Sequence, residues 1–341
     1  MRIAIDAMGG DYAPEAIIHG GVEAARAGKG AYEVVFVGDE AVIEAYLSRH
    51  FRIHELPINI INASQKIEMG ESPMAALKQK RDASIVVAME AQKRGEVDAV
   101  VSAGHTGAAM ASALLSLGRI PGVRRPAIGS LVPHGQGVTF LIDVGANLDC
   151  RPADLLQFGV MGSIYMKYVY NLAQPRVALL NIGEEKTKGS DAIQEGHDLL
   201  LQSNLNFIGN IEGRGVMAGE VEVIVCDGFV GNVVLKFAES FNGVYSKTLK
   251  RKIGKKVFSN IGAFLLKPTF ERLRRIYDYE EYGGAPLLGI NGTCIICHGS
   301  STPKAIRNAV TEASMMIQQD VNGRIRRKLT ARRREKNAEQ D

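Results

Sequence analysis

The sequence holds few cysteines and no long uncharged apolar run, and both shortages narrow the class of protein. Four cysteines in 341 residues are too few for a disulfide framework, which predicts a reducing, cytoplasmic setting. No run of about eighteen uncharged apolar residues occurs, so the sequence predicts no membrane-spanning helix. Asp6 interrupts the apolar start MRIAIDAMGGD, so we also expect no secretory leader.

Several catalytic signatures are missing as well. The chain has no GxxxxGK[ST], GxSxG or HExxH motif, which argues against a P-loop nucleotidase, an elbow-serine hydrolase and a zinc protease. Cys294 and Cys297 form a CxxC without a second pair, so we predict structural thiols and no metal site. GRGVMA, residues 213–218, fits GxGxxG/A, but the run VEVIV follows almost at once and leaves no room for a helix that would hold a pyrophosphate. We therefore expect no dinucleotide cofactor.

What the chain does contain is an alternation of short apolar runs and helical segments. Its 46% hydrophobic content is enough to bury a large core. RIAID precedes PEAIIHGGVEAARAG, YEVVFVG precedes DEAVIEAYLSRH, and VDAVV precedes HTGAAMASALLSLG, which is the pattern of βαβ units. AIGSLV and VTFLIDVG flank PHGQG too closely for a helix and predict a hairpin. We expect an α/β fold, a three-layer αβα arrangement with a mixed, mostly parallel sheet, as a single catalytic unit over residues 1–325.

Positive charge gathers in two places, although the formal net charge is only +4. The first cluster comprises Lys247, Lys250, Arg251, Lys252, Lys255 and Lys256, and the second is RIRRKLTARRR, residues 324–334. Clusters of one sign indicate an anionic partner. For the basic end of the chain, residues 326–341, we expect a flexible tail.

The first basic cluster lies in an amphipathic pattern that predicts a helical excursion over about residues 245–278. Apolar residues recur at every fourth position from Leu249 to Leu265, until Pro268 interrupts the helix. One interpretation is a helix packed on the core or on a second copy of the chain, because core helices have the same periodicity. The other is a membrane-surface contact through Phe258, Ile261, Phe264, Leu265 and Leu266.

Five apolar runs end in turns that are rich in glycine and small polar residues, where open α/β sheets bind ligands. The first turn, DAMGGDYAP, contains Asp6, Gly9 and Gly10, and the alternative for its aspartate is a helix-capping role. The second turn, SAGHTGAAM, precedes a helix and allows a ligand to approach the backbone. Its candidate ligand contacts are Ser102, Gly104, His105, Thr106 and Gly107.

The other three turns lie further along the chain. DVGANLDCRP and CDGFVGNVVLK each join an apolar run to a helix, and they contain Asp143, Gly145, Asn147, Asp227, Gly228 and Asn232. NIGEEKTKGSD contains Lys186 and Lys188, which are either the cations for an anionic substrate or a solvated surface pair. Five such turns in one chain indicate a single extended cleft for an anion.

The ordered segments IDAMGGDYAPE, SAGHTGA, LIDVGAN, LNIGEEKTKG, IEGRG and CDGFVGNVVLK carry a resemblance to a known family. Along nearly its whole length the chain resembles the bacterial phosphate acyltransferases of phospholipid synthesis. The resemblance implies transfer of a fatty acyl group from acyl carrier protein to inorganic phosphate, which gives acyl phosphate for glycerol-3-phosphate acylation. It also implies a fold similar to isocitrate and isopropylmalate dehydrogenases and to phosphotransacetylase, in a homodimer without metal or nucleotide.

The implied chemistry assigns roles to the predicted site. Phosphate is negatively charged, so the site must supply cations and N–H donors and must stabilise the oxyanion that forms on the thioester. Lys186 or Lys188 would be the cation, the amides from Gly104 to Gly107 an anion site, and Asn232 a donor to the oxyanion or to phosphate. His105 would orient phosphate or act as a general base. We expect no metal and no other cofactor.

The resemblance also gives the basic segments a meaning. Acyl carrier protein is acidic and acyl phosphate is membrane-bound, so the segments fit the carrier, an anionic lipid surface or both. We expect a cytoplasmic protein at the inner face of the cell membrane and no nucleic-acid partner. The alternatives are a phosphotransacetylase-like enzyme that uses acyl-CoA, a decarboxylating dehydrogenase, and a membrane-surface scaffold.

Overall fold

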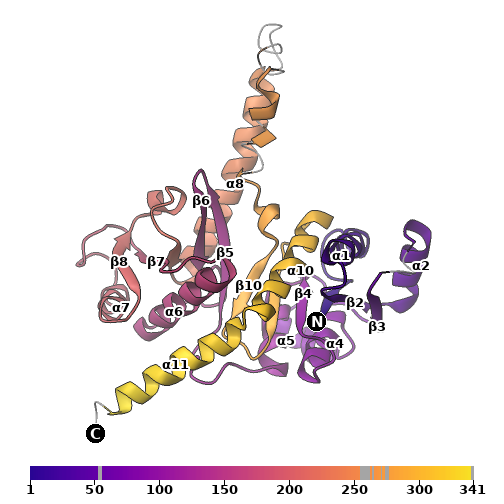
Figure 1. Cartoon of the computed structure of the whole chain (residues 1–341), viewed down its shortest axis with the longest axis horizontal. Coiled ribbons are helices and arrows are strands. Elements are labelled where there is room, and N and C mark those ends of the chain that lie inside the picture. Colours follow the sequence, from indigo (N-terminus) through magenta and orange to yellow (C-terminus); the bar gives the residue numbers. More distant parts are fainter. Residues whose placement is uncertain (53–55, 254–261, 263–264, 270, 273–275, 339–341) are drawn as a thin grey trace. The chain divides into compact units, whose positions relative to one another are not determined.

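The computed structural model describes residues 1–341 except 53–55, 254–261, 263–264, 270, 273–275 and 339–341 (Figure 1). Its backbone divides into two compact units. Unit 1 comprises Met1–Gly129, Ile164–Ala173 and Glu280–Asp341, and unit 2 comprises Ser130–Ser163 and Gln174–Tyr279. With the chain divided into two units, the single catalytic unit expected over residues 1–325 stays a prediction.

Unit 1 is built on a mostly parallel sheet. Its strands are β1 (Arg2–Asp6), β2 (Glu33–Gly38), β3 (Ile58–Asn62), β4 (Ala99–Ser102), β10 (Ala285–Leu288) and β11 (Thr293–Ile296). They follow the order β3-β2-β1-β4-β11-β10, and the first residues of β5 (Ala127–His134) pair with β10. β10 runs antiparallel to β11 and to β5, whereas the other pairs are parallel.

Unit 1 also contains a set of helices. They are α1 (Glu15–Gly28), α2 (Glu40–His50), α3 (Pro73–Gln79), α4 (Ser84–Lys93), α5 (Thr106–Ser116), α10 (Pro303–Gln318) and α11 (Val321–Ala338). α1 and α10 lie close together because α1 has glycine at the contact. A Cβ on Gly20 would lie 2.5 Å from the carbonyl oxygen of Pro303.

A carboxylic acid is buried in the core of unit 1. Glu312 of α10 is 2% exposed, and its Oε1 accepts a hydrogen bond from the hydroxyl of Tyr165. Burial raises the pKa of Glu312 to about 8, and hydrogen bonds from Tyr165 and the Gly284 backbone lower the pKa by less. Glu312 is therefore mostly a neutral acid at pH 7.

Unit 2 continues from β5 into a second set of strands. They are β6 (Gly137–Ile142), β7 (Arg176–Leu180), β8 (Asn206–Ile211) and β9 (Val223–Val225), in the parallel order β6-β9-β7-β8. Gly135 and Gln136 join β5 to its neighbour β6, as the PHGQG segment predicts. The helices are α6 (Pro152–Val169), which continues into unit 1, α7 (Asp191–Leu201) and α8 (Gly228–Ile253), with the short 3-10 helix η1 (Gly213–Met217). A second 3-10 helix, η2 (Tyr279–Tyr282), begins at the last residue of unit 2 and continues into unit 1.

These elements confirm the predicted mixed, mostly parallel α/β fold. The GRGVMA segment forms the single 3-10 turn η1 and not the helix of a dinucleotide site. At the basic end of the chain, for which a flexible tail is predicted, α11 is helical through Ala338. No helix among the described residues is long and apolar enough to cross a membrane.

The predicted excursion at 245–278 is described in part. α8 continues helically to Ile253, and residues 265–269 are helical. Phe258, Ile261 and Phe264 lie outside the described residues. Leu265 and Leu266 are 72% and 51% exposed, so these two predicted contact residues lie on the surface.

Candidate functional site

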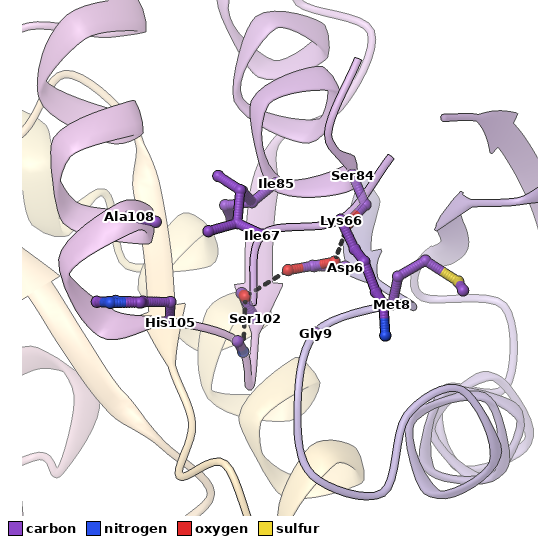
Figure 2. Close-up of a pocket in the computed structure, with 11 residues that line it drawn as sticks. Asp6, Met8, Gly9, Lys66, Ile67, Ser84, Ile85, Ser102, His105 and Ala108 are labelled. Carbon is purple, nitrogen blue, oxygen red and sulfur yellow. Dashed lines mark hydrogen bonds between the residues drawn. The ribbon is translucent and has the colours of Figure 1, made fainter. Parts of the chain in front are cut away.

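The turns after β1 and β4 meet at one edge of the unit 1 sheet. β1, β4 and β11 are parallel neighbours, so their carboxyl ends lie side by side. Asp6 at the end of β1 is 2% exposed, and its Oδ2 accepts a 2.7 Å hydrogen bond from the hydroxyl of Ser102 at the end of β4. The hydroxyl of Ser84, the first residue of α4, donates to Oδ1 over 2.5 Å. Figure 2 shows Asp6 between the two serines.

Glycine allows the two turns to touch through their backbones. A Cβ on Gly9 would lie 2.5 Å from Asp6 Oδ2 and 2.9 Å from the Cα of Gly104. Gly10 has a φ of 124°, which side chains with a Cβ rarely adopt. Backbone atoms of these two turns therefore line the space between them directly.

A small cavity opens at this junction. Beside the predicted Asp6, Gly9, Ser102, Gly104 and His105, its lining includes residues that sequence reasoning missed, among them Lys66, Ile67 and Ser84. Lys66 is exposed and pairs with Glu68 over 3.0 Å. No local pattern marks Ser84 or Lys66, because they reach the cavity only through the packing of α4 and of the loop before α3.

The Asp6 carboxyl controls the direction of both serine hydroxyls. Burial raises the pKa of Asp6, and the hydrogen bonds from Ser84 and Ser102 lower the pKa by less. When Asp6 is ionised, both hydroxyl protons point at its oxygens, and the Ser102 oxygen accepts from the Gly104 amide over 3.1 Å. Ser102 therefore donates inside the protein, and its contact with a ligand stays a prediction.

Helix α5 starts from the same turn. His105 is its N-cap, and the ring Nδ1 accepts a 3.1 Å hydrogen bond from the Gly107 amide. Thr106, the first residue of the helix, is exposed. The predicted residues 102–107 thus form a helix start beside a buried carboxyl.

A turn after β11 joins this edge and was not among the predicted site residues. The Asp11 amide donates to the carbonyl of Gly299 over 2.8 Å, and the Cys297 amide donates to the carbonyl of Ser102 over 2.8 Å. The sequence signal for this turn is HGSS, residues 298–301, where glycine and serine follow an apolar strand. Burial raises the pKa of Cys294 to about 12, which makes it a neutral thiol at pH 7.

Unit 2 brings together a second set of predicted residues, at the ends of β6 and β9. Asp143 is fully buried, and its carboxylate accepts hydrogen bonds from the amides of Gly145, Ala146 and Asn147 and from the Asn147 side chain, over 2.8 to 3.2 Å. Four donors on one carboxylate fix the shape of this turn.

The start of α8 packs on the Asp143 turn. The Gly228 amide donates to the carbonyl of Asn147 over 2.7 Å, and Asp227 caps the helix by accepting from the Val230 amide over 2.9 Å. Asn232 is exposed, and its Cγ would lie 3.8 Å from a Cβ on Gly145. The predicted residues of both turns therefore lie together.

The two candidate lysines lie on the loop between β7 and α7 and differ in their partners. Lys186 Nζ lies 2.7 Å from Asp198 Oδ1, and this contact lowers the pKa of Asp198. Lys188 is exposed and forms no ion pair with any described residue. The side chain of Asn181 donates to the Lys188 carbonyl over 3.0 Å, which holds the loop. The positive charge of Lys188 is therefore less neutralised by acidic side chains than the charge of Lys186.

A hollow beside this loop is poorly suited to an anion. It is lined by Glu184, Glu212 and Glu220 with one cation, Arg214, which pairs with Glu184 and Glu212 over 3.3 and 3.0 Å.

Among the residues that the structure covers, no group of three or more His, Cys, Asp or Glu could hold a metal ion. Whether the sets in unit 1 and unit 2 face one cleft stays a prediction.

Comparison with known proteins gives consistent matches. A family model described as "Fatty acid synthesis protein" matches residues 1–324. The phosphate acyltransferase of Pelotomaculum thermopropionicum is 49% identical, with 93% of this chain and 92% of the relative covered. The phosphate acyltransferase of Heliobacterium modesticaldum is also 49% identical, with 94% and 95% covered. A phosphotransacetylase structure from Streptococcus pyogenes has a TM-score of 0.62 at 18% identity, with 93% and 94% covered, which shows a shared fold.

Proposed function

This chain belongs to the family of fatty acid synthesis proteins, and we propose that it transfers a fatty acyl group from acyl carrier protein to inorganic phosphate. It is an acyltransferase with phosphate as the acceptor, the activity that the names of its relatives carry. Acyl carrier protein as donor, the membrane surface and the homodimer are the finer parts of the proposal. The product, acyl phosphate, would then serve glycerolipid synthesis.

The reaction forms one bond and breaks one. A phosphate oxygen attacks the thioester carbonyl carbon, the carbonyl oxygen becomes an oxyanion, and the C–S bond breaks as the thiolate leaves and takes a proton from solvent. The site must hold a charged nucleophile against the carbonyl and offer donors to the oxyanion. No acyl-enzyme intermediate is required, because phosphate attacks directly.

The observation that carries the site assignment is an exposed lysine that pairs with no acidic residue in the described part of the chain, on a loop held by a hydrogen bond from the Asn181 side chain. In the proposal, Lys188 holds the phosphate charge, with Lys186 beside it on the same loop. Asn232 donates to the oxyanion or to phosphate, and the start of α5 offers its amides to an anion. Asp6 and Asp143 act as internal anchors that shape the turns.

The donor is tested by comparing two substrates. We expect turnover of a long-chain acyl group on acyl carrier protein, with release of acyl phosphate. The alternative of a short-chain acyl-CoA:phosphate acyltransferase draws support from the phosphotransacetylase fold. Exclusive turnover of short acyl-CoA would overturn the carrier proposal while leaving acyl transfer to phosphate intact. Calorimetric binding of NAD would instead favour the dehydrogenase alternative.

Two surfaces support the proposed partners. Leu265 and Leu266 are exposed beyond the basic segment of residues 247–256, an arrangement that fits an anionic membrane surface at the inner face of the cell membrane. On α8, Phe229, Val233 and Phe237 follow one another at every fourth position and are 62%, 56% and 71% exposed. An exposed apolar stripe on one helix face supports a homodimer, with a second copy of the chain covering it.

A non-enzymatic alternative is a scaffold protein that binds the membrane surface. It predicts that liposome binding is the whole function, so it fails if alanine at Lys188 abolishes acyl phosphate formation and leaves liposome binding unchanged. Retention of full activity by alanine variants at Lys186, Lys188 and Asn232 would refute the assigned site.

A further inference from the structure

His105 lines the unit 1 cavity, and its role depends on which ring nitrogen carries the proton. A neutral imidazole has one N–H donor and one lone-pair acceptor, so it serves as a base through one nitrogen and as a donor through the other. The partner of each nitrogen therefore decides between a base and a donor.

The helix cap assigns the lone pair to Nδ1. The Gly107 amide donates to Nδ1 over 3.1 Å, and a backbone N–H cannot accept, so Nδ1 is unprotonated while this bond exists. In the neutral ring the proton is then on Nε2. Within the described part of the chain, the Gly107 bond is the ring's hydrogen bond, so the ring has no partner in Ser84 or Ser102.

The hydroxyls of Ser84 and Ser102 are oriented toward Asp6 and not toward His105. Both hydroxyls donate to Asp6, so neither forms the serine–histidine pair that would make His105 a base for a protein nucleophile. In Figure 2 the His105 ring lies beneath Ala108 and extends away from Ser102. Because both serine hydroxyls donate to Asp6, their protons are not offered to a ligand, whereas the His105 ring stands outside this set of hydrogen bonds.

The helix start also opposes a charged ring. An imidazolium would lose the Gly107 bond and place a positive charge at the positive end of α5, whose first turn carries no acidic residue. The charged groups around the ring are Lys66 and Asp6 of the same cavity and Glu71, which is paired with Lys80. The helix start and the Gly107 bond therefore oppose a proton on Nδ1.

We propose that His105 is a neutral hydrogen-bond donor that presents Nε2–H to an anionic oxygen of the phosphate or of the thioester, and that it is not a general base. This proposal rests on the proposed function. It agrees with the chemistry, because a phosphate dianion has a free lone pair with which to attack and needs no base. The ring would belong to the group of donors that stabilise developing charge.

The tautomer is tested on the free wild-type protein, independently of any activity. Protein labelled with ¹⁵N-histidine is observed by long-range ¹H–¹⁵N spectra, and the His105 signals are identified by their loss in His105→Asn. We expect the Nε2–H tautomer at pH 7 and a shift of the Nε2 signals on titration with inorganic phosphate. An Nδ1–H tautomer, an imidazolium, or no response to phosphate would overturn the proposal.

Two matched variants separate the donor from the cap in kinetics. His105→Gln places an amide N–H near the Nε2 position but cannot act as a base, so we expect kcat/KM within about tenfold of wild type and an unchanged pH profile. His105→Asn keeps a cap for the Gly107 amide, but its shorter side chain has no N–H at the Nε2 position, so we expect wild-type thermal stability with about a 100-fold lower kcat.

The opposite pattern would refute the donor role. If His105→Gln is as inactive as His105→Ala and loses the acidic limb of the pH profile, His105 is a base. If the wild-type protein turns over no acyl carrier thioester, the proposed function fails, and the tautomer measurement and the phosphate titration still decide the state of His105.

Discussion

Replacing Glu312 by glutamine should change how the stability of this protein depends on pH. Glu312 is 2% exposed on α10, and burial raises the pKa of its carboxyl from 4.5 to about 8. Glutamine keeps the size of the protonated acid and an oxygen that can accept from Tyr165, but it does not titrate. The variant therefore removes the proton equilibrium with little change in packing.

The sign follows from proton binding. Between pH 4.5 and about 8 the carboxyl is protonated in the folded chain and ionised in the unfolded chain, so the folded state binds more protons. Stability is then fully present below pH 4.5 and is lost as the pH rises through about 8. At about 1.36 kcal/mol per pH unit, the loss is about 5 kcal/mol in the free energy of unfolding.

The assay is urea unfolding followed by circular dichroism at intervals from pH 5 to 9, for wild type and Glu312→Gln side by side. Other titrating groups contribute equally to both proteins, so the difference between the two curves isolates Glu312. We expect the glutamine variant to gain on wild type by several kcal/mol across this range. Parallel curves would refute the buried neutral acid.

Three further outcomes test the lysine loop, the Asp143 turn and the surface. Lys188→Ala should lower kcat/KM for phosphate about 100-fold. Lys186→Ala should lower it less than about tenfold, because the charge of Lys186 already pairs with Asp198. Equal losses would refute the assignment of Lys188. Gly231→Ala should prevent folding, seen as loss of the cooperative thermal transition, because its Cβ would lie 1.8 Å from the Asp143 carbonyl oxygen. Leu265→Glu should weaken sedimentation with anionic liposomes and leave activity on dissolved substrate unchanged; unaltered sedimentation would contradict the membrane contact.

The fold was largely predictable because its signals are local. Apolar runs ending in glycine mark the strands, and the short PHGQG segment permits only a hairpin between β5 and β6. The helix start at Thr106 follows from the small residues after β4. The absence of a long helix after GRGVMA was also visible from spacing, since β9 begins at Val223.

The contacts of the candidate site were less predictable because they join distant segments. The hydrogen bond from Ser84 to Asp6 spans 78 positions, and nothing near Ser84 in the sequence points to a carboxyl. The same holds for Gly299, which meets Asp11 only because β11 lies beside β4. The sequence also could not tell that Ser102 donates to Asp6, since the direction of a hydroxyl depends on its buried partner.

The place of β11 in the sheet has a consequence for the order in which the chain folds during synthesis. β4 ends at Ser102, but its neighbour β11 is Thr293–Ile296, and α10, which covers α1, follows still later. A growing chain therefore keeps one side of β4 without its partner strand while all of unit 2 is made. Unit 2 is complete in sequence by Tyr279, so it can close first, and unit 1 closes only after β11 and α10 have left the ribosome.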